Sequence, residues 1–316
     1  MPTPFRDGEK PAICFAMTAF LKMHGLGNDF IVLDARDPAN GIPDVIGAAV
    51  ATRLADRHFG IGCDQIMIMH PAKTSGDIYL QMLNADGSEA GACGNGARCV
   101  ASILLSELNK PKVHIETISG VLSACKKNNM IAVDMGPACF LPEDIPFSND
   151  DLNLDDLLYV PFSEVLSQTA TLVSMGNPHA VFFVSDCEAI ELEVIGPLIE
   201  NHAYFPQRAN VEFVQRLSDQ KFRMRVWERG AGITMACGSG ACAAAVAGAR
   251  LGLVRGEVEI ELDGGSLWIE ILADYHDVLP KESSGKNRVI MTGPVSYSFS
   301  GQITDLLSEA SESMTK

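Results

Sequence analysis

The sequence lacks several features that would assign it to common classes of protein. None of its nine cysteines belongs to a CxxC pair, and no histidine stands at metal-ligand spacing from a cysteine, which argues against a disulfide scaffold and a zinc site. No apolar run approaches the roughly 20 residues that a membrane-spanning helix needs. Basic residues are scarce, 24 against 40 acidic ones, and the net charge of −16 disfavours nucleic acid or an anionic membrane as a partner.

These absences predict a cytoplasmic location, because unpaired thiols are typical of reducing compartments. The apolar run 12–21 resembles the core of a secretion signal. However, the charges of Arg6 and Lys10 are offset by Asp7 and Glu9, and no small-residue cleavage site follows. We therefore expect no signal sequence. The length of 316 residues, of which 47% are hydrophobic, suits two globular domains with full cores.

The most informative stretch is 228–245, ERGAGITMACGSGACAAA, in which Cys237 precedes three small residues and an alanine-rich run. Alanine favours a helix, and glycines let backbone N–H groups approach a ligand, so the thiol is predicted to lie at a helix N-terminus. The helix dipole and the free N–H groups favour an anion there. We expect a reactive thiol whose pKa falls from about 8.5 toward the ~3.5–7.5 range, beside a place for a carboxylate.

An internal repeat puts a second cysteine in the same setting. Residues 84–101 read NADGSEAGACGNGARCVA, where Cys93-Gly-Asn-Gly-Ala repeats the Cys237 motif with one change. Repeated motifs in a single order indicate a duplication, which would bring two helix N-termini to a shared cleft. The other matches are Gly27-Asn28 with Gly176-Asn177, Asn84 with Glu228, Val113–Glu116 with Val258–Glu261, Gly120 with Gly265, and Gly136-Pro137 with Gly293-Pro294.

Each half contains many short strands around one strongly apolar helix. The strands do not alternate regularly with helices, which disfavours a doubly wound sheet. The sequence predicts an α+β fold of two pseudo-symmetric domains, each an antiparallel β-barrel-like sheet around a central helix. The first domain spans 19–137 with a closing strand near 294–301, and the second spans 138–293. Residues 1–18 and 302–316 are an N-terminal extension and a C-terminal tail.

Two thiols that face one cleft suit inversion at a carbon that carries hydrogen beside a carboxylate. One thiolate removes the proton from one face, while a neutral thiol returns a proton to the opposite face. The backbone N–H groups of Gly94, Asn95, Gly238 and Ser239 would stabilise the charge that develops on the carboxylate. No metal or cofactor motif accompanies these residues, so we expect chemistry that uses neither.

The motifs from about 20 to 301 resemble those of the diaminopimelate epimerase family: KMHGLGNDF, GCDQ, NADGSEAGACGNGARC, MGNPH, RANVEF and ERGAGITMACGSGAC. The resemblance implies cofactor-independent interconversion of LL- and meso-diaminopimelate, in lysine and peptidoglycan precursor synthesis, by a homodimer. It makes Cys93 the proton donor and Cys237 the acceptor, supported by His179 and Glu228. Its substrate-binding positions fall on Asn28, Gln65, Asn84, Asn177, Asn210, Glu228 and Arg229, beside Gly94, Asn95, Gly238 and Ser239.

A substrate with two amino-acid ends fits these residue types, since Arg229 suits a distal carboxylate and Glu228 an ammonium group. Two residues depart from the family's pattern: Ile233 stands where an acidic residue is common, and Ala92 where a bulkier residue is usual. They bear on loop rigidity and cleft volume rather than on reaction type. The other cysteines are predicted to be packing residues: Cys14, Cys63, Cys99, Cys125, Cys139, Cys187 and Cys242.

Three alternatives stay open at this point. A racemase of the proline racemase type also uses paired cysteines, but its cyclic substrate has no second charged end for Arg229. A nucleotide-binding protein is suggested by the spacing of Gly94 and Gly96 before a helix, although the third glycine and the ribose-binding acid of that motif are missing. The third alternative is a thiol-redox or non-catalytic binding protein.

Overall fold

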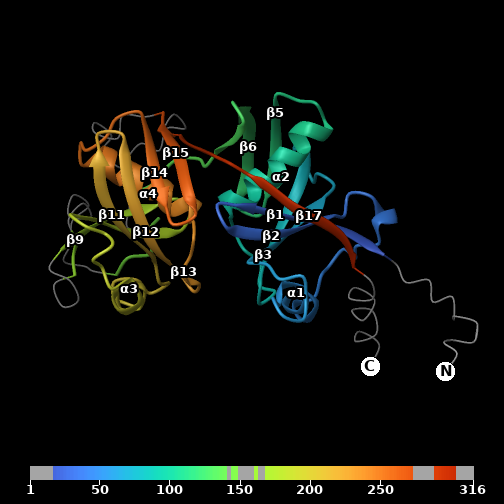
Figure 1. Cartoon of the computed structure of the whole chain (residues 1–316), viewed down its shortest axis with the longest axis horizontal. Helices are drawn as coiled ribbons and strands as arrows, with labels where there is room; N and C mark the ends of the chain where they lie inside the picture. Colours follow the sequence, from blue (N-terminus) through green and yellow to red (C-terminus); the bar gives the residue numbers. More distant parts are fainter. Residues whose placement is uncertain (1–16, 141–143, 149–159, 163–167, 273–287, 304–316) are drawn as a thin grey trace, which may run out of the picture.

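The computed structural model describes residues 17–140, 144–148, 160–162, 168–272 and 288–303. Figure 1 shows two lobes, each a curled sheet around one helix. That helix is α2 (Gly94–Glu107) in the first half of the chain and α4 (Gly238–Arg250) in the second. No helix in the described ranges has both the length and the apolar character needed to cross a membrane.

Between residues 17 and 140 the structure contains one further α-helix, α1 (Ala48–Ala55), the short 3-10 helix η1 (Pro38–Asn40), and seven strands. The strands are β1 (Thr18–Gly25), β2 (Asn28–Asp34), β3 (Gln65–His70), β4 (Ile78–Asn84), β5 (Lys112–Thr117), β6 (Gly120–Lys127) and β7 (Met130–Asp134). Their apolar residues alternate with polar ones or form short buried runs, as strands that cover a core require.

The second half adds α3 (Leu192–Glu200) and the remaining strands. These are β8 (Val160–Pro161), β9 (Thr169–Ser174), β10 (Pro178–Val184), β11 (Asn210–Ser218), β12 (Lys221–Glu228), β13 (Gly232–Ile233), β14 (Glu257–Leu262), β15 (Gly265–Ile271), β16 (Val289–Gly293) and β17 (Ser296–Ile303). The short strands β8 and β13 and the helix η1 were not predicted, because so few residues carry no readable periodicity.

The sheet is mixed, whereas the sequence predicted antiparallel pairing throughout. Among the described strands, four neighbouring pairs run parallel: β2 with β3, β4 with β5, β10 with β11, and β12 with β14. One α-helix lies between the strands of each parallel pair in sequence, from α1 to α4 in turn, because parallel neighbours need a crossover connection. The same order of hairpins and crossovers occurs in both halves. The prediction of a duplicated, sheet-dominated α+β fold is confirmed.

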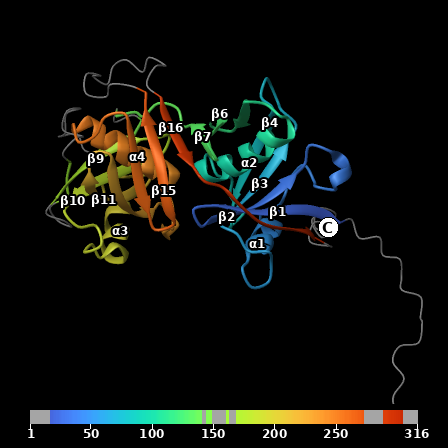
Figure 2. The ribbon, with the colours of Figure 1, turned by 45° about the horizontal axis from the view of Figure 1, so that its top comes forward.

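In the part of the chain that the structure describes, two strand pairings join the halves. β7 of the first half pairs antiparallel with β16, where Val133 lies opposite Met291, and Figure 2 shows the two strands side by side at the junction. After β16 the chain returns to the first half, where β17 pairs antiparallel with β1. The predicted division of the chain at 137 and 138 remains a prediction.

The two enclosed helices owe their position to small apolar residues. α4 reads GSGACAAAVAGAR and is buried along most of its length, and α2 is buried from Gly94 to Ala101. A helix that is apolar on all sides must be enclosed. A Cβ at Gly248 would lie 2.6 Å from the Phe222 ring, so strands pack directly on the helix backbone at this point. The cysteine that begins each helix is therefore held at the end of a rigid core element.

Candidate active site

Both cysteines are N-caps of the enclosed helices. Cys93 begins α2 and Cys237 begins α4, each with an extended backbone. The Cys93 sulfur accepts a hydrogen bond from the backbone N–H of Gly96 at 3.3 Å, and the Cys237 sulfur accepts one from Gly240 at 3.3 Å. An acceptor at the N-cap satisfies an N–H group that the first helical turn leaves unpaired. The prediction that both thiols lie at helix N-termini is confirmed.

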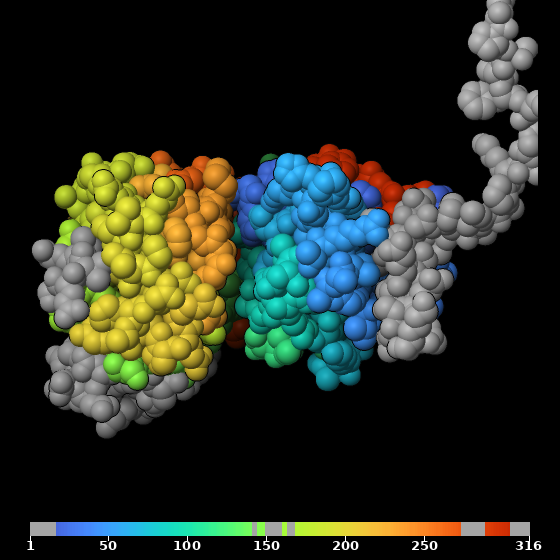
Figure 3. All heavy atoms as spheres, turned by 90° about the horizontal axis from the view of Figure 1, so that it is seen from below, coloured from blue at the N-terminus to red at the C-terminus, as the bar shows by residue number. Residues whose placement is uncertain are grey.

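The two helix N-termini meet where the halves join. The side-chain nitrogen of Asn95, in the first turn of α2, donates to the carbonyl oxygen of Ala236, just before α4, at 3.0 Å. A Cβ on Gly94 would come within 2.6 Å of Met291 Cε, and one on Gly238 within 3.0 Å of its sulfur. Both first-turn glycines therefore approach the same methionine. Figure 3 shows, from one side, the furrow between the two lobes.

Burial gives both thiols a raised pKa, where the sequence predicted a lowered one. Burial raises the pKa of Cys93 to about 12; the N–H of Gly96 lowers it, and the charge of Glu228 raises it further. Burial, followed by the charges of Glu228 and Glu212, raises the pKa of Cys237 well above its usual value. A helix N-terminus stabilises a nearby negative charge by about 0.3–1 kcal/mol, which lowers a pKa by less than one pH unit. Full burial can raise the pKa of a thiol by up to about 3–5 pH units. Both thiols therefore carry their protons at neutral pH.

Glu228 lies at the end of β12 and acts on both thiols. Thr234 Oγ1 donates a hydrogen bond to its Oε1, and the Cys237 thiol is hydrogen-bonded to the same carboxyl group. Burial raises the pKa of Glu228, while the bonds to Thr234 and Cys237 lower it. Its charge also reaches Cys93 in the other half. The structure thus brings together Cys93, Cys237 and Glu228, three of the four residues predicted to be catalytic.

A chain of polar side chains leads from Glu212 to Cys237. His179 Nδ1 lies 2.6 Å from Glu212 Oε1, and both side chains are fully buried. His179 Nε2 lies 3.0 Å from Asn177 Oδ1, and Asn177 Nδ2 donates to Ser239 Oγ at 3.4 Å. That hydroxyl lies 3.6 Å from the Cys237 sulfur. The imidazole of His179 thus lies between the side-chain oxygens of Glu212 and Asn177.

Asn28 occupies the corresponding place in the first half. Gly27, with φ 87°, turns the chain just before Asn28, as Gly176, with φ 89°, does before Asn177. Such positive φ values favour glycine because it has no Cβ. Asn28 Oδ1 lies 3.9 Å from the Cys93 sulfur. The repeated turn therefore places one asparagine near each thiol.

The four other predicted binding residues form two pairs at strand ends. Gln65 Nε2 donates to Asn84 Oδ1 at 2.9 Å, where the two residues face each other across β3 and β4. The backbone N–H of Arg229 donates to Asn210 Oδ1 at 2.8 Å. The exposed guanidinium of Arg229 donates to the carbonyl oxygen of Gln207 at 3.3 Å. Within the described ranges, neither pair is hydrogen-bonded to a thiol. Their role toward a substrate stays a prediction.

Arg98, a fully buried cation in α2, was not predicted to be a site residue. Its Nη1 lies 3.3 Å from the Met291 sulfur, and Nε and Nη2 have no hydrogen-bond partner among the atoms that the structure describes. Burial lowers the pKa of Arg98, and its charge lowers that of Cys93 against the larger effect of burial. Glu212 was missed in the same way. A charged residue inside an apolar run, as in GARCVA or NVEFV, is the signal that could have identified both.

A duplicated, two-lobed sheet around two enclosed helices defines a class of fold that also occurs in proteins of known structure. A hydroxyproline epimerase from Agrobacterium vitis matches with a TM-score of 0.62, covering 92% of this chain and 93% of its own. Its sequence identity of 16% shows the shared fold alone.

The sequence comparisons identify the family within that class. The family model for diaminopimelate epimerase matches residues 20–141 and 171–297. A diaminopimelate epimerase from Rhodospirillum centenum is 48% identical, covering 91% of this chain and 93% of its own. One from Acidiphilium cryptum is 44% identical, covering 91% and 97% respectively. The chain belongs to the diaminopimelate epimerase family, as its motifs predicted.

Proposed function

We propose that this protein is an isomerase that interconverts LL- and meso-diaminopimelate, and that it serves lysine and peptidoglycan precursor synthesis. One observation carries the proposal. Two thiol-capped helix N-termini from opposite halves, at Cys93 and Cys237, meet through the hydrogen bond from Asn95 to Ala236. Family membership supplies the substrate class.

The reaction needs one base and one acid on opposite faces of the α-carbon. The Cys237 thiolate takes the α-proton, and the electron pair of the C–H bond moves onto the adjacent carboxylate. The Cys93 thiol then gives its proton to the other face of the carbon, which leaves Cys93 as the thiolate and Cys237 as the thiol. In the reverse direction the roles exchange. The first-turn N–H groups of α2 and α4 are suited to stabilise the charge on the carboxylate.

The surroundings of Cys237 suit a strong base. The burial and the acidic neighbours that raise its pKa also strengthen the thiolate as a base toward a feebly acidic α-hydrogen. Glu228, hydrogen-bonded to this thiol and itself with a raised pKa, is placed to accept the Cys237 proton before the reaction begins. His179, held by Glu212, acts through Asn177 and Ser239 on the same sulfur.

A racemase that acts on a cyclic amino acid is the second candidate, since a hydroxyproline epimerase shares the fold. Arg229 and Glu228 disfavour it, because a cyclic substrate offers no second pair of charged groups for them. Incubation of the purified protein with LL-diaminopimelate in deuterated water separates the candidates. We expect meso product that carries deuterium at one α-carbon, at a rate unchanged by chelator or added pyridoxal phosphate. Deuterium in proline instead would favour the second candidate.

Replacing Arg229 by lysine should lower kcat/KM about 5- to 150-fold. The guanidinium can bind a distal carboxylate through two parallel hydrogen bonds, whereas lysine offers a point charge. The loss corresponds to about 1–3 kcal/mol of transition-state binding. Steady-state kinetics of Arg229→Lys measure it. Arg216→Lys is the matched control, since Arg216 pairs with Asp219 in a remote hairpin. An unchanged kcat/KM for Arg229→Lys would exclude it as a ligand.

We also infer a cytoplasmic homodimer. All eight cysteines that the structure describes are free, which suits a reducing compartment. The strand β17 pairs only with β1 within the described ranges, and it exposes 56% of Tyr297 and 49% of Phe299. Exposed aromatic side chains on an edge strand are suited to contact a second copy. Sedimentation equilibrium gives the mass in solution, and a monomer at working concentrations would contradict the inference.

A further inference from the structure

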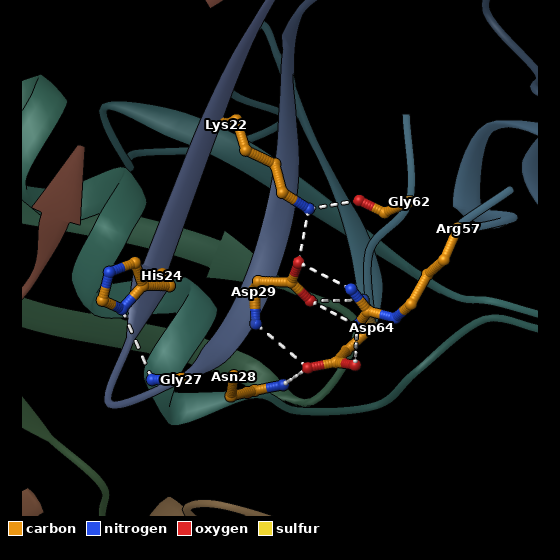
Figure 4. Close-up of polar contacts among 8 residues, drawn as sticks. All are labelled: Lys22, His24, Gly27, Asn28, Asp29, Arg57, Gly62 and Asp64. Carbon is orange, nitrogen blue, oxygen red and sulfur yellow. Dashed lines mark hydrogen bonds and ion pairs between the residues drawn. The ribbon is translucent and has the colours of Figure 1, made fainter. Parts of the chain in front are cut away.

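Four charged side chains form an ion cluster beside the turn that precedes Asn28: Lys22, Asp29, Arg57 and Asp64 (Figure 4). The two aspartates bind each other's backbone N–H at 3.0 Å in both directions. Arg57 Nη2 donates to Asp29 at 2.8 Å and to Asp64 at 2.7 Å, and Lys22 donates to Asp29 at 2.5 Å. Burial raises the pKa of Asp29, but the bonds from Arg57 and Lys22 bring it down to about 2. Asp29 and Asp64 are therefore held in place by hydrogen bonds to backbone N–H groups and to the Arg57 guanidinium.

This cluster determines which way the Asn28 amide points. Asn28 Nδ2 lies 2.8 Å from Asp64 Oδ2, and the atom at this position must be the nitrogen because an ionised carboxylate only accepts. Oδ1 is then turned toward Asn95 Nδ2 at 3.2 Å and the Cys93 sulfur at 3.9 Å. The carbonyl oxygen of Ala236 also can only accept, so the Asn95 atom that faces it is the amide nitrogen, Nδ2. An oxygen beside the Cys93 sulfur can only accept the S–H proton.

The equivalent amide in the second half has the opposite orientation relative to its thiol. Asn177 Oδ1 lies 3.0 Å from His179 Nε2, and Asn177 Nδ2 donates to Ser239 Oγ at 3.4 Å. Because Ser239 Oγ accepts this bond, its own proton is free to point at the Cys237 sulfur, 3.6 Å away. Cys93 therefore has the Asn28 oxygen as a side-chain acceptor, whereas Cys237 has the Ser239 hydroxyl beside it in addition to the carboxyl group of Glu228. An acceptor favours the protonated form, and a donor favours the thiolate.

We propose that Asp64 is a positioning residue, which holds the Asn28 oxygen toward Cys93 and so keeps that thiol in its proton-carrying form. The consequence for catalysis, that Cys93 is the acid when Cys237 is the base, rests on the proposed function. The direction of the hydrogen bond between Asn28 and Cys93 does not depend on the proposed function. Asp64 acts through Asn28 and needs no contact with a substrate.

Other charged and titratable groups also face Cys93 and must stay constant in a test. Glu228, from the end of β12, raises the pKa of Cys93, and Arg98, from α2, lowers it, both less than burial does. The thiol of Cys99 lies within electrostatic range on the same helix. Substitutions at Asp64 leave all three in place.

The test compares three variants at one position. Asp64→Ala removes the acceptor, and Asp64→Ser ends one bond short of it, so in both variants the weaker bond from Asn95 Nδ2 at 3.2 Å is what still orients the Asn28 amide. Asp64→Asn removes the charge but keeps an oxygen for Asn28 Nδ2 and the N–H of Asp29, with its own amide nitrogen turned toward Arg57. The guanidinium can then rely on Asp29, which it already contacts. Thermal melts establish that each variant is folded.

The first readout is the rate at which iodoacetamide alkylates Cys93 relative to Cys237 at pH 8, followed by peptide mass mapping. A released amide can turn its N–H toward the sulfur, which lowers the thiol pKa by about one unit. Tenfold more thiolate, partly offset by weaker nucleophilicity, gives about threefold faster alkylation in Asp64→Ala and Asp64→Ser. Asp64→Asn should match the parent. An unchanged ratio in Asp64→Ala and Asp64→Ser, or the same increase in Asp64→Asn, overturns the proposal.

The second readout is the pH profile of kcat/KM with LL-diaminopimelate. The alkaline limb should move to lower pH in Asp64→Ala and stay in place in Asp64→Asn. A merely structural defect would lower kcat/KM equally at every pH, and that result would count against the proposal. Failure of the proposed function has a different signature: the parent protein itself would not turn over, while the alkylation ratios would still report the orientation of Asn28.

Discussion

Cys93→Ala and Cys237→Ala should each reduce epimerisation to the assay background, a loss of at least about 10²–10⁴-fold. Each helix N-terminus holds one thiol, and inversion needs proton transfer at both faces of the carbon. The remaining thiol can still exchange protons on its own face. Deuterium should therefore enter only one stereoisomer in each variant, and the two variants should exchange opposite isomers. Chiral analysis of each isomer after incubation in deuterated water measures this.

The matched control is Cys187→Ala, which removes a buried thiol from the core beside α3 and should keep kcat within about twofold. If both active-site variants exchange the same isomer, the two thiols do not face opposite sides of the carbon. Full epimerase activity in either variant would remove that cysteine from the mechanism.

Oxidation should inactivate the protein completely and reversibly by joining Cys93 to Cys237. The two helix N-termini are in direct contact through Asn95 and Ala236, and only a bound substrate carbon would keep the sulfurs apart. A shift of a few ångströms would bring them to the ~2.05 Å of a disulfide bond. Activity should fall in peroxide, return with dithiothreitol, and be protected by substrate. Peptide mapping of the inactive form should find the Cys93–Cys237 bond; free thiols at both positions would rule it out.

The pH dependence of this inactivation follows from the raised thiol pKa. The thiolate is the form that reacts, and with the pKa of Cys93 at about 12 its fraction rises tenfold for each pH unit throughout the neutral range. The initial rate of inactivation in peroxide should increase in proportion from pH 6.5 to 9. A rate that levels off between pH 7 and 8 would mean that the helix N-terminus outweighs burial, and the lowered pKa first expected from the motif would be restored.

Local sequence was sufficient to place the thiols. Small residues followed by an alanine-rich run determine where α4 begins, and the repeated motif then places α2 in the same way. The parallel pairings were not predicted, because β4 and β5 meet only after the chain has passed through α2, and strand periodicity carries no information on such partners. The duplication could be predicted from the order of the repeated motifs alone, whereas the direction of each strand relative to its neighbour could not.

The electrostatics of the site depended on contacts between distant segments. The helix that lowers a thiol pKa is visible in CGSGA, but the burial and the carboxylates that raise it come from β11 and β12. Glu212 and Asp64 both lie inside motifs that were recognised, yet their partners, His179 and Asn28, are 33 and 36 residues away in sequence. The types of the site residues were predictable, and the directions of their hydrogen bonds were not.

The return of β17 to β1 has a consequence for synthesis on the ribosome. β1 is the first strand that the structure describes, but its outer partner, β17, is Ser296–Ile303, almost 280 residues later in the sequence. The edge of β1 therefore stays unpaired while the whole second half is translated, and an open edge can pair with another chain. The sheet of the first lobe is therefore complete only after β17 has been translated. Nascent chains that stop short of residue 296 should need a chaperone to remain monomeric.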